Sequence, residues 1–344
     1  MEPVAFLYLD YFGTPLWAWL LFGGLVTALL AFDLGVLHRK TREIPVGESL
    51  FLSAGYIAVA LLFGAWTWWA MGAEAGMDYL TAFLVEKSLS LDNVFVISLI
   101  FATLAVPRHL QHRVLFYGIL GVIVLRAIVI GFGTAVVAQF SWVLFLFGGF
   151  LILTGIKILL IADKPAAVAE GPMLRFLRRH LRLTDGLRGE SFFSREPHPA
   201  TGTPVVFATP LFVALILVEV ADLIFAVDSV PAVLAITTDP YIVYTSNIFA
   251  ILGLRALYFA LAASVHRFHY LKYALALVLV FIGAKIFVNL IYGKIDPAIS
   301  LGVTFSLLAG GMLFSIWKTR SSLTQRPVRA DAAGGAPLPG CIDK

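Results

Sequence analysis

The feature that most constrains this chain is a series of apolar runs, each about 20 residues or longer, that repeats along most of its length. A run of this length is what an α-helix needs to cross the hydrocarbon core of a bilayer. With 60% of its residues hydrophobic and 13% charged, the chain is too apolar for a soluble domain, which is about one quarter charged. We therefore predict an all-α membrane protein with about nine transmembrane helices, over residues 15–37, 50–71, 78–105, 113–137, 142–162, 208–237, 241–265, 270–292 and 297–317.

Basic residues occur in every second connection between these helices. Lys and Arg lie in 38–49, 106–112, 163–207, 266–272 and the C-terminal tail, whereas the other connections carry only Lys294. The positive-inside rule then places the N-terminus outside and the C-terminus in the cytoplasm, in a bacterial inner membrane. The predicted segments are an external N-terminus (1–14), two helices (15–71), three helices (78–162), a basic cytoplasmic loop (163–207), three more helices (208–292), a ninth helix (297–317) and a disordered cytoplasmic tail (318–344).

The loop 163–207 is the longest segment predicted to lie outside the membrane. Its basic stretch Arg175–Arg188 suits a surface that rests on the anionic inner leaflet. The alternative is a solvated linker that carries only topology signals. The loop is also where we expect protein partners, if there are any.

The two three-helix segments resemble each other. The first contains LVEKSLSLDNVFV (84–96) and the second VADLIFAVDSVPA (220–232). Because their first helices are predicted to run in opposite directions, the segments form an inverted repeat, which is typical of secondary transporters. Chance similarity between apolar helices is the alternative. The matched pairs are Glu86 with Asp222, Asp92 with Asp228, Asn93 with Ser229, Arg126 with Arg255, Gly155 with Gly283, and Lys157 with Lys285.

Eleven charged residues fall in the interior of the predicted spans, away from the span ends. They are Asp33, Glu86, Lys87, Asp92, Arg126, Lys157, Glu219, Asp222, Asp228, Arg255 and Lys285. Each costs about 2.5–3.5 kcal/mol at the centre of a helix, so buried ionisable groups indicate a functional site. Salt bridges that only fix the helix register are the alternative, above all for the lysines, Asp33 and Glu219.

Helical geometry groups the acidic residues. Residues seven apart share a helix face, so Glu86 lies above Asn93 and Asp222 above Ser229, with Asp92 and Asp228 bordering those faces. Pro231 cannot donate to the carbonyl of Val227, which frees a backbone oxygen beside Asp228. The predicted metal ligands are Glu86, Asp92, Asn93, Asp222, Asp228 and Ser229, with Asp33 and Glu219 as additional candidates and Arg126, Arg255, Lys157 and Lys285 as charge-balancing or structural residues.

Oxygen ligands of this kind favour hard cations such as Mn²⁺, Mg²⁺ and Ca²⁺. The histidines lie in the inner loops or at helix ends and the single cysteine, Cys341, lies in the tail. Ligands for zinc or copper are therefore missing from the predicted spans. The residue types alone do not indicate which of these hard cations is bound. No bound cofactor is expected.

The chain resembles the TerC/Alx family of integral membrane proteins. The segments that carry the resemblance are FDLGVLHRK (32–40), FLVEKSLSLDNVFVISLIF (83–101) and the long segment 218–261, which begins VEVADLIFAVDSVPAVLAITTDP. The resemblance implies a transporter-like membrane protein connected with manganese export, alkaline pH and tellurite resistance. It places Glu86, Asp92, Asn93, Asp222, Asp228 and Ser229 at the ion site and selects Mn²⁺ as the transported ion.

The leading hypothesis is a secondary transporter that exports Mn²⁺ in exchange for protons. The alternative is a membrane scaffold or assembly factor that acts in tellurite resistance through partners bound at 163–207. No GxxxxGK[ST] loop for an ATPase and no HExxH motif is present, so we expect no enzyme. The formal net charge of +4 comes from short loops, and without a basic patch interleaved with aromatic residues it does not indicate nucleic-acid binding.

Overall fold

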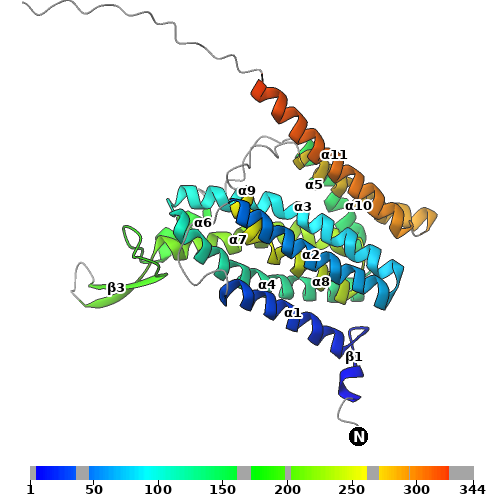
Figure 1. Cartoon of the computed structure of the whole chain (residues 1–344), viewed down its shortest axis with the longest axis horizontal. Helices are drawn as coiled ribbons and strands as arrows, with labels where there is room; N and C mark the ends of the chain where they lie inside the picture. The colour runs from blue at the N-terminus through cyan, green and yellow to red at the C-terminus, as the bar shows by residue number, and fades with distance from the viewer. Residues whose placement is uncertain are drawn as a thin grey trace, which may run out of the picture.

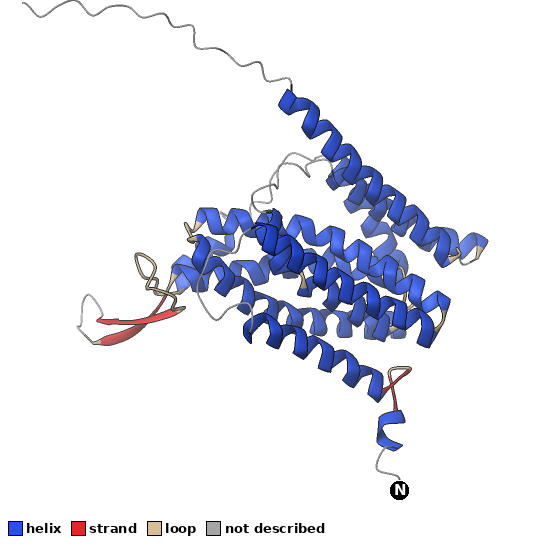
Figure 2. Cartoon of the chain, viewed as in Figure 1, coloured by secondary structure: helices blue, strands red, loops and turns tan. Residues whose placement is uncertain are grey.

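The structure is a bundle of long helices with two small β-hairpins (Figures 1 and 2). The computed structural model describes residues 5–35, 46–160, 172–197, 203–261, 271–293 and 295–324. Its long helices are α1 (Leu16–Gly35), α2 (Val46–Met71), α3 (Ala73–Thr103), α4 (Arg108–Gln139), α5 (Val143–Leu160), α7 (Pro210–Leu234), α8 (Pro240–Leu252), α10 (Leu271–Tyr292) and α11 (Pro297–Thr324). The shorter elements are η1 (Ala5–Tyr8), β1 (Asp10–Tyr11), β2 (Thr14–Pro15), α6 (Pro172–His180), β3 (Phe193–Pro197), β4 (Pro204–Ala208) and α9 (Leu254–Leu261).

The prediction of an all-α membrane protein is confirmed. Within the described part of the chain, eight helical segments are long and apolar enough to cross a membrane, with α8 and α9 together forming one of them. Helix α3 is not among the eight, because its apolar stretch is interrupted by Glu86, Lys87 and Asp92. With 31 residues it is about 46 Å long, and it packs between α2, α7, α8 and α11. Its crossing of the membrane as a ninth span stays a prediction.

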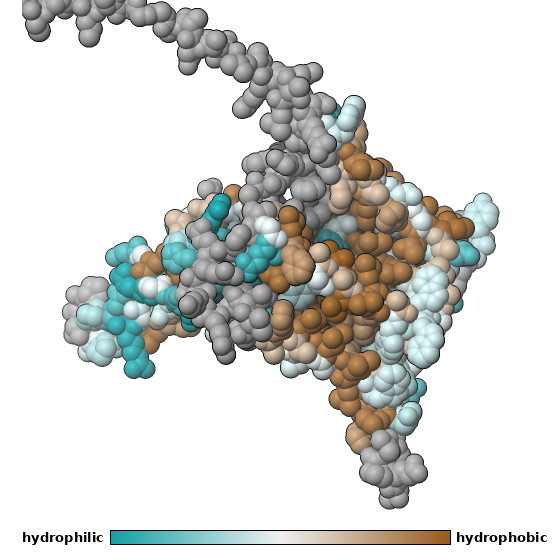
Figure 3. Space-filling view, in the orientation of Figure 1, coloured by the Kyte–Doolittle hydropathy of each residue, from teal (hydrophilic) through white to brown (hydrophobic). Residues whose placement is uncertain are grey.

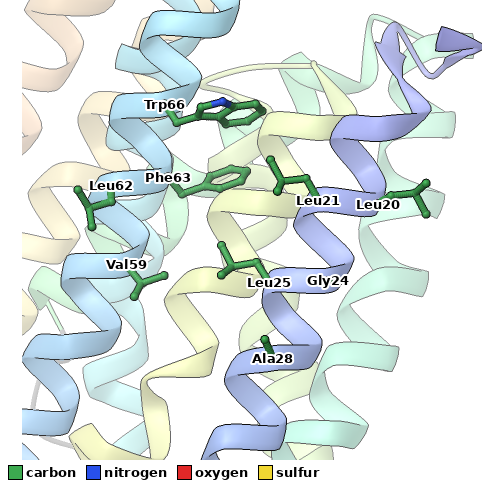
Figure 4. Close-up of a pocket in the computed structure, with 9 residues that line it drawn as sticks. All are labelled: Leu20, Leu21, Gly24, Leu25, Ala28, Val59, Leu62, Phe63 and Trp66. Atoms are coloured by element: carbon green, nitrogen blue, oxygen red, sulfur yellow. The ribbon is translucent and has the colours of Figure 1, made fainter. Parts of the chain in front are cut away.

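The face of the bundle that Figure 3 shows is apolar over its middle, as a lipid-facing surface must be. Large apolar side chains there are strongly exposed, for example Phe132 and Leu62. A shallow groove between α1 and α2 is lined only by apolar residues, among them Leu21, Phe63 and Trp66 (Figure 4). The polar side chains gather instead at the end of the bundle that carries α6 and β3.

The helix predicted over 241–265 is broken. Helix α8 ends at Leu252 and α9 begins at Leu254, with Gly253 between them, and residues 262–265 lie outside the described part. Lys87 of α3 donates a hydrogen bond of 3.0 Å to the carbonyl oxygen of Ala250. A Cβ atom on Gly253 would lie only 2.9 Å from the Lys87 Nζ atom. The partly buried ammonium group therefore satisfies a carbonyl of the last turn of α8, as a cation at a helix C-terminus can.

Helices α5 and α10 contact each other in a reciprocal way. A Cβ atom on Gly155 of α5 would lie 2.6 Å from the carbonyl oxygen of Ala276, and a Cβ atom on Gly283 of α10 would lie 2.6 Å from the carbonyl oxygen of Gly148. The order of these contacts along the two helices shows that the helices are antiparallel. The sequence offset that pairs Gly155 with Gly283 also pairs Gly148 with Ala276, so equivalent positions make equivalent contacts. The inverted repeat stays a prediction. It requires equivalent positions of the two halves to make equivalent contacts, as these positions do.

The segment predicted as a basic loop contains secondary structure. Strands β3 and β4 pair antiparallel, from Phe193 opposite Ala208 to Pro197 opposite Pro204. In α6, Leu174 and Leu177 are buried against the ends of α3, α4 and α7, whereas the arginines of α6 are exposed. The hairpin and η1 lie at opposite ends of the long helices (Figure 1). Residues 163–171 and 198–202 of this loop lie outside the described part.

The boundary predicted for the C-terminal tail is wrong. Helix α11 continues through Thr324, so residues 318–324 are helical rather than disordered. These residues have no helix-breaking Gly or Pro, and both accumulate only beyond Arg326. The rest of the predicted tail, 325–344, lies outside the described residues.

Candidate functional site

A single arginine organises the polar centre of the bundle. Arg126 of α4 is 1% exposed. Its Nε and Nη2 atoms donate hydrogen bonds of 2.9 Å to the two carboxylate oxygens of Asp222. Its Nη1 atom donates to Glu86 Oε1, to Ser229 Oγ at 2.9 Å and to Asn247 Oδ1 at 3.2 Å. The guanidinium thus contacts five oxygen atoms, contributed by α3, α7 and α8.

The helical periodicity explains why these side chains meet. Asp222 and Ser229 are seven residues apart on α7 and project from one face, as the sequence predicts, and both contact Arg126. Asn93 lies seven residues after Glu86 on α3, and its Nδ2 atom donates to Asp222 Oδ1 at 3.3 Å. Glu86, Asn93, Asp222 and Ser229 are each at most 5% exposed as whole residues. Arg126 therefore pairs with two core carboxylates, Glu86 and Asp222.

Several polar atoms of the Arg126 cluster have no hydrogen-bond partner within the described part of the chain. They are Glu86 Oε2, Asn93 Oδ1 and Asn247 Nδ2. A buried polar atom without a partner costs about 1–3 kcal/mol, so each such atom in a native protein calls for an explanation. Two of the three are oxygens that accept hydrogen bonds or bind cations.

Glu219 lies beside this cluster, close to Asp222. It packs directly over Gly121 of α4: a Cβ atom on Gly121 would lie 2.1 Å from Glu219 Oε1. The other carboxylate oxygen, Oε2, is buried and has no hydrogen-bond partner among the described residues. Gly121 therefore provides the space that a carboxyl group occupies, five residues before Arg126 on the same helix.

The structure does not bring all predicted ligands together. Asp228 lies near Thr154 and Lys157 of α5 and does not contact Arg126, because it is six residues from Asp222 and projects toward a different helix. Asp92 lies on α3, but its side chain is outside the described part. No group of three or more His, Cys, Asp or Glu side chains placed to hold a metal ion occurs among the residues described. The assignment of these residues as metal ligands stays a prediction.

The remaining buried charges have separate partners. Arg255 pairs with Asp33 of α1, which is not one of the four carboxylates predicted at the core of the site. Lys285 of α10 donates a hydrogen bond of 3.2 Å to Ser300 Oγ, with Asp78 close by. The matched arginines of the predicted repeat, Arg126 and Arg255, therefore have different partners.

Lys285 also lines a polar cavity at the end of the bundle opposite α6. Acidic residues near the start of α3 and in the connections before α8 and α11 line the same cavity: Glu74, Asp78, Asp239 and Asp296. Asp239 caps α8 by accepting hydrogen bonds from the backbone N–H groups of Tyr241 and Ile242. Burial raises the pKa of Asp239 above its ordinary value of 3.8, and these two hydrogen bonds oppose the shift.

One residue of the cluster is missing from the sequence prediction. Asn247 lies in α8, which contains no charged residue. A search for buried charges in the sequence therefore does not find it. A different signal is present nonetheless. Thr245, Ser246 and Asn247 form a run of three polar residues within an otherwise apolar span. The two hydroxyl groups bond to backbone carbonyls of the preceding turn, which leaves Asn247 as the one that reaches the site.

Comparisons with known proteins agree with this architecture. The family model described as "Integral membrane protein TerC family" matches residues 71–323. An "Uncharacterized membrane protein STKORF319" of Myxococcus xanthus is 47% identical over 313 residues, covering 91% of this chain and 95% of the relative. A "Putative membrane-bound redox modulator Alx" of Escherichia coli K12 is 44% identical over 314 residues, covering 89% of this chain and 95% of the relative. No solved structure gives a significant match.

Proposed function

Because the chain belongs to the TerC family of integral membrane proteins, we propose that it is a secondary transporter that exports a hard divalent cation, Mn²⁺. The observation that carries the proposal is the pair of carboxylates, Glu86 and Asp222, buried at the centre of the bundle. Acidic groups inside a membrane span are costly and mark ion pathways by default. The activity proposed is transport and not catalysis.

The donor atoms around these carboxylates support a hard cation. The Arg126 cluster presents carboxylate, amide and hydroxyl oxygens from three helices. Two further oxygens, Glu86 Oε2 and Asn93 Oδ1, are buried and have no partner among the described residues. Ligands of this type suit Mn²⁺, Mg²⁺ and Ca²⁺, and the choice of Mn²⁺ comes from the family resemblance.

The arrangement of α5 and α10 supports a transporter of the inverted-repeat type. Such transporters bind their substrates near the midplane, where the two repeats meet. The reciprocal contacts of Gly155 and Gly283 join the third helices of the two predicted repeats. The first helices, α3 and α7, each contribute one carboxylate to the central cluster.

For orientation, we propose an inner-membrane protein with its N-terminus outside and its C-terminus in the cytoplasm. The alternation of basic connections along the sequence supports this topology. The cavity lined by Asp78, Asp239 and Asp296 would then open on the outer side. A cleft lined by negative charge concentrates cations.

The printed name of the Escherichia coli relative includes the words "redox modulator". This chain has a single cysteine, Cys341, so one copy lacks the pair of thiols that a dithiol–disulfide cycle uses. We propose that any redox effect, like any tellurite resistance, is indirect and follows from the transported ion. An oxyanion would favour positive groups, whereas the central site carries two acids and one arginine.

The experiment is Mn²⁺ accumulation in bacteria that lack their own manganese exporters. Cells carrying the intact protein should hold less manganese than empty cells, and cells carrying Glu86→Gln or Asp222→Asn at matched membrane levels should not. Glu190→Gln is the matched control, because it makes the same acid-to-amide change at a half-exposed residue outside the helices.

The scaffold hypothesis predicts the opposite pattern. If the protein acts through partners at 163–207, the amide variants in the bundle keep function and changes in the hairpin β3–β4 abolish it. Equal manganese levels in cells with and without the intact protein would contradict the export proposal.

A further inference from the structure

Resting on the proposed function, we infer that Arg126 is an internal counter-cation: its guanidinium occupies the cation site when no ion is bound, and the divalent ion displaces it. The five oxygens that contact the guanidinium belong to Glu86, Asp222, Ser229 and Asn247. These are the ligand types that a hard cation takes. The guanidinium and the ion therefore compete for one set of donors.

The charge balance of the site favours one cation at a time. Glu86 and Asp222 together carry two negative charges when ionised, and both are buried. With Arg126 in place the cluster keeps one negative charge, and with a divalent ion in its place the cluster is neutral. Both cations together would leave an excess positive charge in a medium where an uncompensated charge is expensive.

The two unpartnered oxygens indicate where an incoming ion first binds. Glu86 Oε2 and Asn93 Oδ1 accept no hydrogen bond from any described residue, and their side chains are 0% and 5% exposed. Each belongs to a residue whose other polar atom is already held within the Arg126 cluster. An ion that binds these oxygens also approaches the carboxylates that Arg126 holds, and so begins to compete with it.

A displaced guanidinium needs a second acceptor, and Glu219 is placed to be one. Its buried Oε2 atom has no partner in the described part of the chain, and Gly121 of α4 makes room for its carboxyl group. Glu219 precedes Asp222 by three residues, so both lie on adjacent positions of one face of α7. Arg126 can therefore exchange Asp222 for Glu219 while it stays between the same two helices.

Such an exchange explains how Glu86 and Asp222 are not left together without a counter-cation when the transporter is empty. Once the ion has left, the guanidinium returns to Glu86 and Asp222 and restores the arrangement seen in this structure. Arg126 is in this sense a positioning and competing residue for the ion, not a ligand of it.

The test is Mn²⁺ binding to the purified full-length protein in lipid nanodiscs, measured by calorimetry. Arg126→Gln removes the competitor and should tighten Mn²⁺ binding by about tenfold or more. Glu219→Gln removes the second acceptor and should weaken Mn²⁺ binding by roughly fivefold or more. The double variant Arg126→Gln with Glu219→Gln should bind Mn²⁺ as tightly as Arg126→Gln alone, because Glu219 acts only through Arg126.

Arg255→Gln is the matched control. It also removes a buried arginine, one that pairs with Asp33, and should not tighten Mn²⁺ binding. If Arg126→Gln does not give folded protein, the test rests on Glu219→Gln. An Mn²⁺ affinity of Glu219→Gln equal to that of the intact protein then overturns the inference. A folded Arg126→Gln variant that binds Mn²⁺ as the intact protein does, or more weakly, overturns it as well.

The same titrations separate this inference from the proposed function. If neither the intact protein nor any variant binds Mn²⁺, the proposed function fails and the inference fails with it. If the intact protein binds Mn²⁺ and Asp222→Asn does not, the proposed site stands, and only the responses of Arg126→Gln and Glu219→Gln decide whether Arg126 competes.

Discussion

Arg126 binds Asp222 through two parallel hydrogen bonds, Nε to Oδ2 and Nη2 to Oδ1, each 2.9 Å long. This fork geometry belongs to arginine alone among the basic residues. It ties α4 to α7 at the centre of the bundle, and the third nitrogen of the same group reaches α3 and α8. One planar group thereby fixes the relative positions of four helices.

Arg126→Lys should therefore destabilise the protein although it keeps the charge. A lysine ammonium cannot form the parallel pair with Asp222, and loss of a hydrogen bond to a charged group costs about 1.5–3 kcal/mol. Thermal unfolding of the purified protein in nanodiscs measures the change. Arg113→Lys is the control: Arg113 is paired with Glu190 at the surface, where an ion pair contributes less than about 1 kcal/mol. Equal losses in the two variants would contradict the prediction.

Gly155→Ala and Gly283→Ala should destabilise the α5–α10 contact by similar amounts. Each added Cβ atom would meet a backbone carbonyl oxygen at 2.6 Å, and backbone cannot move aside as a side chain can. Overpacking of this kind costs about 1–3 kcal/mol. Gly149→Ala, on the same helix as Gly155 but with open space around it, should be neutral in the same unfolding assay.

Because the contacts are reciprocal, both glycine variants should lose stability. If only one of the two glycine variants loses stability, the helices do not contact each other through equivalent positions in the membrane. The predicted repeat would then lose its main structural support.

Gly121→Ala should act on Mn²⁺ binding as Glu219→Gln does. The added methyl group occupies the place of the Glu219 carboxylate and pushes it out of the space over Gly121. We expect weaker Mn²⁺ binding in calorimetry with little loss of stability, since a glutamate side chain can change rotamer. Gly118→Ala, one turn earlier, adds a methyl group at an ordinary 3.4 Å from Val218 and should leave binding unchanged.

Asp239→Asn should stabilise the protein at neutral pH and lose that advantage in acid. Burial raises the pKa of Asp239 in the folded state above 3.8, so the folded protein binds this proton more tightly than the unfolded chain. Its contribution to stability is greatest below the unfolded pKa and falls as the pH rises through the folded pKa. Asparagine caps a helix about as well and does not ionise.

The measurement is the unfolding midpoint of Asp239→Asn relative to the intact protein between roughly pH 4 and pH 7. The difference should grow in favour of the variant as the pH rises. A difference that does not depend on pH would mean that the ionised Asp239 is not penalised by its surroundings.

The basic helix α6 should lie against anionic lipid. Its leucines are buried, Arg175, Arg178 and Arg179 are exposed, and Phe176 is 54% exposed between them. Basic residues near an anionic surface contribute about 1 kcal/mol each. A thiol at position 176, made by Phe176→Cys in a Cys341→Ser background, should react more slowly with a water-soluble reagent in phosphatidylglycerol nanodiscs than in phosphatidylcholine nanodiscs.

Replacing the three arginines of α6 by glutamine should remove that difference between lipids. If the thiol reacts equally fast in both lipids before the arginines are changed, α6 is a solvated part of the loop. That outcome would favour the alternative in which these charges serve only to set the topology.

Much of the fold follows from apolar length alone. The predicted spans agree with the long helices within a few residues at most ends, because about 20 apolar residues in a row have few other stable structures. The break at Gly253 was not predicted, and the hydrogen bond from Lys87 of another helix to the carbonyl of Ala250 beside it cannot be read from the spacing along one helix. The extension of α11 past residue 317 was not predicted for a different reason. Polar residues can continue a helix beyond the membrane, and they give no apolar pattern from which to recognise it.

The site was predicted in part. Period-seven spacing correctly joined Asp222 to Ser229, and it placed Glu86 and Asn93 on the face that meets them. It could not show that Asp228 faces α5, because spacing along one helix does not reveal which neighbour each face meets. Nor could it reveal that the arginine stands between the two carboxylates, where the sequence alone suggested an ion.

The reciprocal contacts of Gly155 with Ala276 and of Gly283 with Gly148 bear on the origin of the chain, if the predicted repeat holds. A surface that meets its own equivalent is isologous, the kind of interface that joins two copies of one subunit about a two-fold axis. Within a single polypeptide, the two halves of such a pair are free to diverge. Arg126 and Arg255 are matched in the predicted repeat, yet one holds the central carboxylates and the other pairs with Asp33 on a helix that belongs to neither predicted half. If the predicted repeat holds, the chain is a fused pair that assigns different tasks to matching residues, which a homodimer encoded by one gene cannot do.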